Sequence, residues 1–266
     1  SSKTRLRWQA ERPMALWHGD VCHGPTLQVQ GKGRPLRLHA LLDDASRYVV
    51  ALEGTWSTRA EAVRECLEAT FTQSGVPEAM LVDHGTPWWN MRAMTGWTWL
   101  TVWLMKQGIR MHFSGYRHPQ TQGKVERFHG TLAAAMRRRG APVHTQRQAW
   151  LDACRYEYNH VRPHQALGMR TPASVWNMSS KRYQPNPPSW EYETGAKVRK
   201  VDAEGRLYLQ GRSWEISRAL VGEPVQLIRI EGRILVYYCR SLVRELDPRN
   251  QRSTAVDRWL RPDPEV

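Results

Sequence analysis

The stretch HPQTQGKVERFHGTL, residues 118–132, decides how the rest of the chain is interpreted. Pro119 and Gly123 mark its entry, and apolar side chains then recur every three or four residues, which predicts an amphipathic helix. The apolar stripe consists of Val125, Phe128, Leu132 and Met136. Glu126 lies off this stripe, between Lys124 and Arg127. A carboxylate in that setting is more often a solvated helix residue with an ion partner than a catalytic group, so a catalytic role needs support from elsewhere.

Two apolar runs that end on aspartate give this support. ALWHGD, residues 15–20, ends on Asp20, and MLVDHG, residues 80–85, contains Asp83 directly after its apolar part. A carboxylate at the end of a buried strand is costly unless it is paired, hydrogen-bonded or bound to a metal. Mg²⁺ binds well to a few carboxylates, several waters and substrate phosphate oxygens. The sequence therefore predicts that Asp20, Asp83 and Glu126 converge on divalent cations.

Together with YNHVRPHQALGMRTPASVW, residues 158–176, these motifs resemble the DDE-type transposases and integrases of bacterial insertion sequences, close to the IS481-like group. The resemblance covers about residues 10–180. It implies an α/β fold with a ribonuclease-H-like mixed sheet flanked by helices. It also implies an enzyme that cuts DNA 3′ ends and transfers the strand during transposition. Asp20, Asp83 and Glu126 would be the catalytic residues and would hold two Mg²⁺ ions, for which Mn²⁺ would substitute.

Two other functions remain open. A ribonuclease-H-like nuclease would use a similar acidic set, but it would lack the stretch at residues 118–132 and the RPHQALG stretch at residues 162–168. A domesticated, non-catalytic DNA-binding protein would not need all three carboxylates. The basic composition agrees with any DNA-binding function, since 39 Lys and Arg against 25 Asp and Glu give a net charge of +14. Residues 1–189 hold 25 of the basic and 13 of the acidic side chains, so most of the excess lies there.

Several side chains near the three carboxylates are candidate DNA contacts. His84 follows the second aspartate, where the resembled family more often has Asn. Trp88 and Trp89 lie in a segment with Pro and polar neighbours, which favours an exposed loop next to Asp83. The other candidates are Arg117, His118, Gln122, Lys124, Arg127, His129, Arg162 and His164. The partner is expected to be double-stranded DNA, both element ends and target, bound by a homo-oligomer of the chain.

Other sequence features narrow the chemistry. The four cysteines show no CxxC spacing, which indicates free thiols in a reducing compartment. His18, Cys22 and His23 are close in sequence, but no fourth zinc ligand is evident. Asp43 and Asp44 follow an apolar run and are interpreted as turn residues, not ligands. No membrane span or signal peptide is expected, and the predicted location is the cytoplasm, at the bacterial nucleoid.

The predicted domain organisation starts with an N-terminal arm, residues 1–12, and a catalytic domain, residues 13–180. A Pro-rich linker, residues 181–192, leads to a small SH3-like β-barrel, residues 193–248, and a tail, residues 249–266, with a short helix near residues 256–260. The resembled family usually has an N-terminal helix-turn-helix module. No such pattern occurs here, so we expect the sequence to be part of a longer protein.

The predicted elements of the catalytic domain alternate between strands and helices. The strands are expected at residues 15–22, 36–42, 48–52, 79–82 and 109–113, and the helices at residues 57–74, 95–107, 123–139 and 146–159. In the second helix, Trp99, Leu100, Trp103 and Leu104 are expected to face the core. The six strands predicted after the linker lie at residues 197–201, 207–210, 213–216, 225–230, 234–239 and 242–246.

Overall fold

The computed structural model describes residues 9–90, 96–114 and 123–256. The chain divides into two compact units, which are described separately. The first consists of Ser1–Ser57, Ala69–Ala79 and Gln122–Arg182, and the second of Thr58–Glu68, Met80–Thr121 and Tyr183–Val266. None of the helices in the described residues has the length and apolar composition that crossing a bilayer requires.

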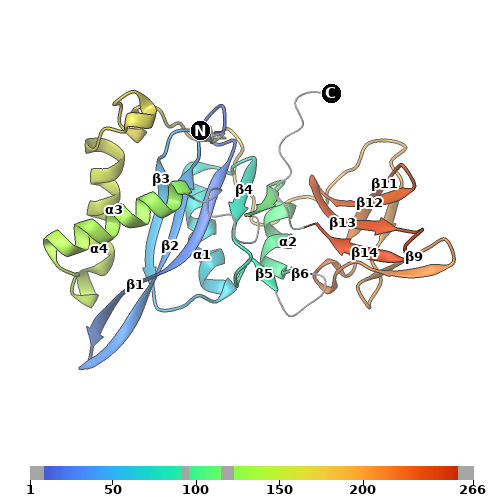
Figure 1. Cartoon of the computed structure of the whole chain (residues 1–266), viewed down its shortest axis with the longest axis horizontal. Helices are drawn as coiled ribbons and strands as arrows, with labels where there is room; N and C mark the ends of the chain where they lie inside the picture. The colour runs from blue at the N-terminus through green and yellow to red at the C-terminus, as the bar shows by residue number, and fades with distance from the viewer. Residues whose placement is uncertain (1–8, 91–95, 115–122, 257–266) are drawn as a thin grey trace, which may run out of the picture. The chain divides into compact units, whose positions relative to one another are not determined.

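Three antiparallel strands form the framework of the first unit. They are β1 (Trp17–Val29), β2 (Lys32–Asp43) and β3 (Val49–Thr55) (Figure 1). Both β1 and β2 are longer than predicted, because the segment between them continues their ladder to a tight turn at Gln30 and Gly31. Both turn residues have positive φ, 49° and 75°, as the compact hairpin turns of twisted strands require.

Two helices cover the apolar side of this sheet. The first is α3 (Gly123–Arg139), where Val125, Phe128 and Leu132 are buried as predicted. The second is α4 (Arg147–Tyr156), which buries Leu151 and Cys154 and continues as a π-turn (Glu157–Val161). Their apolar side chains join those of β2 and β3 in one core cluster. The predicted amphipathic helix is thus confirmed, with Glu126 on its exposed side.

The remaining strands of the catalytic sheet are β4 (Ala79–Val82) and β7 (Arg110–Phe113), and the sheet order is β3-β2-β1-β4-β7. Helix α1 (Ala60–Ser74) precedes β4 and ends at Gly75, as predicted. Helix α2 (Trp99–Lys106) begins at residue 99 because Thr98 caps it, whereas Gly96–Trp97 forms β6 and pairs with β5 (Trp89–Asn90). Leu100, Trp103 and Leu104 are buried, but the predicted inward position of Trp99 is wrong, since it is 42% exposed.

The C-terminal part of the chain is a small β domain. Its larger sheet has the order β14-β13-β12-β11-β8. Strands β9 and β10, which come between β8 and β11 in the chain, form a separate two-stranded hairpin. These strands are β8 (Val198–Lys200), β9 (Arg206–Leu209), β10 (Arg212–Glu215), β11 (Pro224–Ile230), β12 (Arg233–Tyr238), β13 (Ser241–Asp247) and β14 (Arg252–Ala255). The last strand was not predicted: residues 252–255 pair with β13 and are not part of a free tail. The proposed helix near residues 256–260 lies almost wholly outside the described residues.

Short helical turns complete the chain. They are His144–Gln146, Gln165–Leu167, Pro172–Ser174 and Arg218–Leu220. The π-turn after α4 carries Asn159, whose amide fixes this segment to the sheet. Its Oδ1 accepts from Val49 N–H at 2.9 Å, and its Nδ2 donates to Val49 C=O at 2.9 Å. Asn159 is 2% exposed, so both of these backbone groups depend on one side chain.

We expect Asn159→Ala to lower the free energy of unfolding by about 2 kcal/mol or more, because it leaves a buried N–H and a buried C=O without a partner. Urea denaturation followed by circular dichroism measures the change. Asn177→Ala is the matched control, since Asn177 is exposed and its side chain, within the described residues, donates to the carbonyl of its neighbour Met178. The effect of this change on the free energy of unfolding should stay within about 0.5 kcal/mol. Equal effects of the two variants would contradict the structural role of Asn159.

Candidate functional site

Asp20 lies in β1, opposite Ala40 of β2. Its side chain retains 19% exposure, so the carboxylate keeps contact with solvent although it belongs to a central strand. One partner is His129 of α3, whose Nδ1 lies 3.2 Å from Asp20 Oδ2. Asp20 and His129 are 109 residues apart in sequence, so the packing of α3 on the sheet creates this contact.

Glu126 stands in the first turn of α3, where a negative charge is favoured by the helix dipole. It is exposed, and neither adjacent cation is paired with it. Lys124 Nζ lies 2.5 Å from Asp44 Oδ1, and Arg127 Nε donates to the Gly123 carbonyl at 2.9 Å. Within the described part of the chain Glu126 forms no ion pair. The common alternative, a surface glutamate neutralised by a helix neighbour, is therefore not what the structure has.

His129 contacts Asp20 and lies on the same helix as Glu126. It lies one turn after Glu126 on α3, and the Glu126 charge acts to raise its pKa, although burial has the larger effect and the pKa is lowered overall. Its second ring nitrogen, Nε2, lies 3.6 Å from Cys22 Sγ. Cys22 is two residues after Asp20 on β1 and so points to the same side of the sheet. This alternation is the signal by which the sequence could have revealed Cys22.

Asp20, Cys22 and His129 could in principle form a metal centre, because their ligand atoms lie within 4.8 Å of one another. Two observations argue against a soft-metal site. Burial and the Asp20 charge raise the pKa of the Cys22 thiol to about 12, which keeps the thiol protonated. In addition, the imidazole turns Nδ1 to Asp20 and Nε2 to Cys22, so no single nitrogen faces both. The arrangement is a row of polar contacts from Cys22 through His129 to Asp20.

Asp83 belongs to the second unit, where it directly follows β4. It is partly buried. Gly85 leaves space for its carboxylate: a Cβ at Gly85 would lie 2.8 Å from Asp83 Oδ2. The His84 ring lies 5.3 Å from Phe113 and 5.6 Å from Trp89, centroid to centroid, so it packs among aromatic rings.

The predicted exposure of the loop after Asp83 is wrong. Trp88 is 1% and Trp89 7% exposed, because the chain folds back on itself and both backbone N–H groups donate to the Gly85 carbonyl. Trp89 then packs against Trp97 and Phe113, at centroid distances of 5.3 and 4.8 Å. These indoles fill the core of the second unit and do not offer a surface for base stacking.

The other candidate DNA contacts differ in their positions. Arg117, His118 and Gln122 lie outside the described residues. Arg162 is exposed, and its guanidinium donates to Thr131 Oγ1 at 3.5 Å. His164 packs edge-on against Tyr158, at 4.7 Å between centroids, so its ring supports the packing of this turn.

Lys124 belongs to a buried charge network at the turn after β2. Asp44 accepts from Ala10 N–H at 2.7 Å, lies 2.6 Å from His18 Nε2, and pairs with Lys124. Although burial acts to raise it, the pKa of Asp44 falls to about 2 because of the His18 hydrogen bond and the two neighbouring charges. Asp43 accepts from Ser46 and from Met14 N–H. Both aspartates thus have structural partners, as expected of turn residues.

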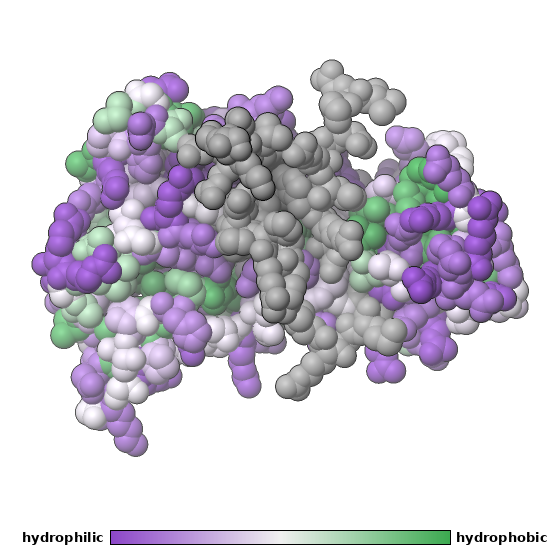
Figure 2. All heavy atoms as spheres, viewed as in Figure 1, coloured by the Kyte–Doolittle hydropathy of each residue, from purple (hydrophilic) through white to green (hydrophobic). Residues whose placement is uncertain are grey.

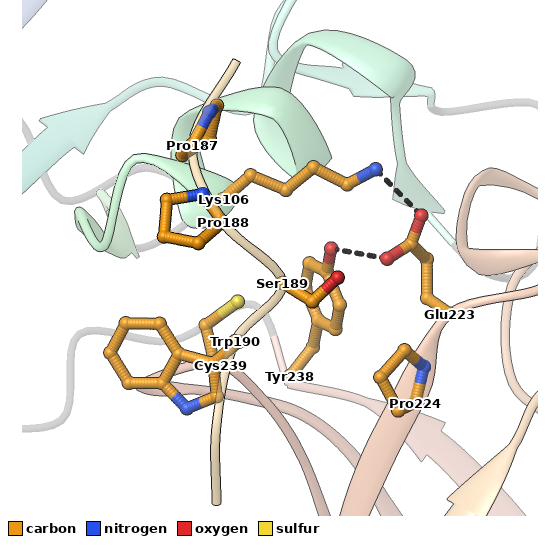
Figure 3. A pocket seen from close by; sticks show the side chains of 9 residues that line it. All are labelled: Lys106, Pro187, Pro188, Ser189, Trp190, Glu223, Pro224, Tyr238 and Cys239. Carbon is orange, nitrogen blue, oxygen red and sulfur yellow. Dashed lines mark hydrogen bonds and ion pairs between the residues drawn. The ribbon is translucent and has the colours of Figure 1, made fainter. Parts of the chain in front are cut away.

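A small cavity of about 100 Å³ lies in the second unit (Figure 3). Among the described residues that line it, the one carboxylate is Glu223, which is held by Lys106 Nζ at 2.6 Å and by the Tyr238 hydroxyl at 2.8 Å. Prolines 187, 188 and 224 and Trp190 line the rest of it. Because both carboxylate oxygens are engaged, this cavity joins α2 to the β domain and is not a second acidic centre.

Comparison with known proteins identifies the family. Residues 10–119 and residues 107–172 match two family models, each described as an integrase core domain, and together these span residues 10–172. Residues 196–254 match the C-terminal domain of the IS481 family transposases.

Three solved structures are similar to this chain. The simian T-cell lymphotropic virus intasome in complex with PP2A regulatory subunit B56 gamma is similar over 96% of this chain and 82% of that chain, with 15% identity and a TM-score of 0.52. The HTLV-2 integrase catalytic core in complex with magnesium (dimeric form) covers 62% of this chain and 97% of its own, with 15% identity and a TM-score of 0.46. The BIV integrase catalytic core covers 61% and 93%, with 20% identity and a TM-score of 0.46.

The mixed sheet flanked by helices is the ribonuclease-H-like architecture of integrase cores, and the small β domain follows it. Enzymes of this class are polynucleotidyl transferases that use divalent metal ions. The chain therefore belongs to the integrase-core group of DNA transposases and integrases, with the C-terminal domain of the IS481 family.

Proposed function

We propose that the chain cuts the 3′ ends of an insertion sequence and joins them to target DNA, with Asp20, Asp83 and Glu126 as the ligands of two Mg²⁺ ions. The observation that carries this proposal is the grouping around His129. Asp20 Oδ2 lies 3.2 Å from Nδ1 of this imidazole, and Glu126 lies one helical turn before it on α3. Two carboxylates from distant parts of the chain thus share one neighbour, and Glu126 forms no ion pair within the described part of the chain.

The donor set fits Mg²⁺ better than a softer metal. Carboxylate oxygens are the ligands that Mg²⁺ prefers, Glu126 is exposed and Asp20 is partly so, and the adjacent Cys22 thiol stays protonated. Mn²⁺ would be expected to substitute. When bound, two such ions activate the attacking hydroxyl and stabilise the leaving oxygen. The protein's part is to hold three like-charged carboxylates in place for these ions.

The proposed substrate is double-stranded DNA. The net charge of +14 favours a polyanionic partner. Because an insertion sequence has two ends to be processed, we propose that two or more copies of the chain assemble on DNA. The proposed place of action is the bacterial nucleoid.

The two alternatives from the sequence make different predictions. A ribonuclease-H-like nuclease would hydrolyse its substrate but would not join a pre-cut 3′ end to a second duplex. A domesticated DNA-binding protein would bind DNA without any metal-dependent change to it. The family match to transposase and integrase domains favours strand transfer over both.

We expect Glu126→Gln to reduce strand transfer by about 10³-fold or more, because it removes a charge that would hold the metal ions while keeping the shape of the side chain. Joining of a labelled, pre-cut oligonucleotide to plasmid DNA measures this. Glu61→Gln is the matched control, since Glu61 is also an exposed glutamate in the first turn of a helix. Transfer near the wild-type rate by the Glu126 variant would rule out the assignment.

His129 is expected to orient Asp20 through Nδ1. In His129→Asn the amide nitrogen takes nearly the place of Nδ1, whereas in His129→Gln it takes nearly that of Nε2. The Mg²⁺ concentration for half-maximal transfer should stay within a few-fold of wild type for Asn and rise about 10- to 100-fold for Gln, as for other residues that position metal ligands.

The rise in melting temperature on titration with Mg²⁺ or Ca²⁺ provides a second measurement that is independent of catalysis. The metal concentration at half of this rise should be close to the wild-type value for His129→Asn and higher for His129→Gln. If Gln matches wild type and Asn does not, the contact with Cys22 is the important one and the proposed role of Nδ1 is wrong.

A further inference from the structure

The end of the β1–β2 hairpin is a basic surface that the proposed active site does not use. The β2–β3 pairing ends at Arg37 and Thr55, but the β1–β2 pairing continues to Val29 and Lys32. The hairpin end therefore extends beyond β3 (Figure 1, lower left). The same region is hydrophilic in the space-filling view (Figure 2). Residues 21–42 contain no Asp or Glu, so this end of the hairpin has no negative side chains of its own.

One face of this hairpin gathers cations around an indole. The Arg34 and Arg147 guanidinium carbons lie 4.8 and 5.2 Å from the centroid of the Trp56 ring. The two like charges are therefore held within about 10 Å of each other, by the sum of these distances. Lys32 is two residues from Arg34 on β2 and so shares its face. We call Lys32, Arg34, Trp56 and Arg147 the hairpin face.

Hydrogen bonds and ring contacts hold the arginines of the hairpin face in place, and no described carboxylate neutralises them. Arg147 is anchored by hydrogen bonds to the Gly54 and His144 carbonyls, at 3.1 and 2.9 Å. Trp56 packs against the core cluster and so offers a fixed support. Within the described residues no carboxylate pairs with Lys32, Arg34 or Arg147. Fixed guanidinium groups without carboxylate partners suit the phosphate groups of a nucleic-acid backbone.

We propose that the hairpin face binds the phosphate backbone of duplex DNA at a distance from the cut site. Seven residues separate Asp20 from Leu27, which pairs with Arg34, so the face lies roughly 20 Å along the strand from Asp20. At about 3.4 Å per base pair this corresponds to some six base pairs. The expected contact is with DNA flanking the reacting phosphate, and the role rests on the proposed function of Asp20.

The test measures DNA affinity against salt concentration for a fluorescein-labelled 30-base-pair duplex of mixed sequence, with Ca²⁺ in place of Mg²⁺. Each lost phosphate contact should lower the slope of log K against log salt by about 0.9. Arg34→Gln should therefore lower it by about 0.9, and Lys32→Gln with Arg34→Gln by about 1.8, with a loss of affinity on the order of tenfold or more near 0.1 M salt.

Arg37→Gln is the matched control, because Arg37 is three residues from Arg34 on the same strand and so lies on the opposite face. Strand transfer adds a second control: the double variant should need more DNA for half-maximal rate, while its rate at saturating DNA stays unchanged. A slope equal to wild type, or an equal loss in Arg37→Gln, would overturn the proposal, as would a fall in the saturated rate.

The salt slope involves no catalysis. It can therefore fail while Glu126→Gln still abolishes strand transfer, and it can succeed if the catalytic assignment is wrong.

Discussion

The structure depends on how the sheet accommodates carboxylates that folding removes from water. An unpaired buried carboxylate costs several kcal/mol, so each one must gain partners or keep access to solvent. Asp43 and Asp44 are fully buried and are satisfied by backbone N–H groups, Ser46, His18 and Lys124. Asp20, on the strand that pairs with β2, keeps 19% exposure and contacts His129. Solvent exposure therefore separates the two buried structural aspartates from a carboxylate that a ligand can reach.

The two cations at the start of α3 also have partners elsewhere in the protein. The helix begins with Lys124, Glu126 and Arg127 within one turn, an arrangement that would normally neutralise the glutamate. Instead the lysine is drawn to Asp44 of the sheet and the arginine to its own helix carbonyl. The buried turn after β2 thus has an effect at the exposed face of α3, because it keeps one cation away from Glu126. Stability and function are connected through Lys124.

Much of the catalytic domain was predictable because its signals are local. The stripe of Val125, Phe128 and Leu132 fixed the helix and the exposed side of Glu126, and β4 began and ended where its apolar run did. The failures were cases in which tertiary packing decided. Trp88 and Trp89 have polar neighbours in sequence, but a turn at Gly85 directs them inward, and Trp99 lies outward although its helix neighbours are buried. Strand β14 is polar and forms only because β13 offers an edge.

The contact between His129 and Asp20 was beyond local reasoning for the same reason, since it joins residues 109 positions apart. Its position has a mechanical consequence. Glu126 and His129 are three residues apart on one helix, so they move together if α3 shifts on the sheet. Any displacement that moved Glu126 would also alter the partner of Asp20. One rigid helix, seated by Val125 and Phe128 in the core, therefore sets the positions of two of the three proposed metal ligands at once.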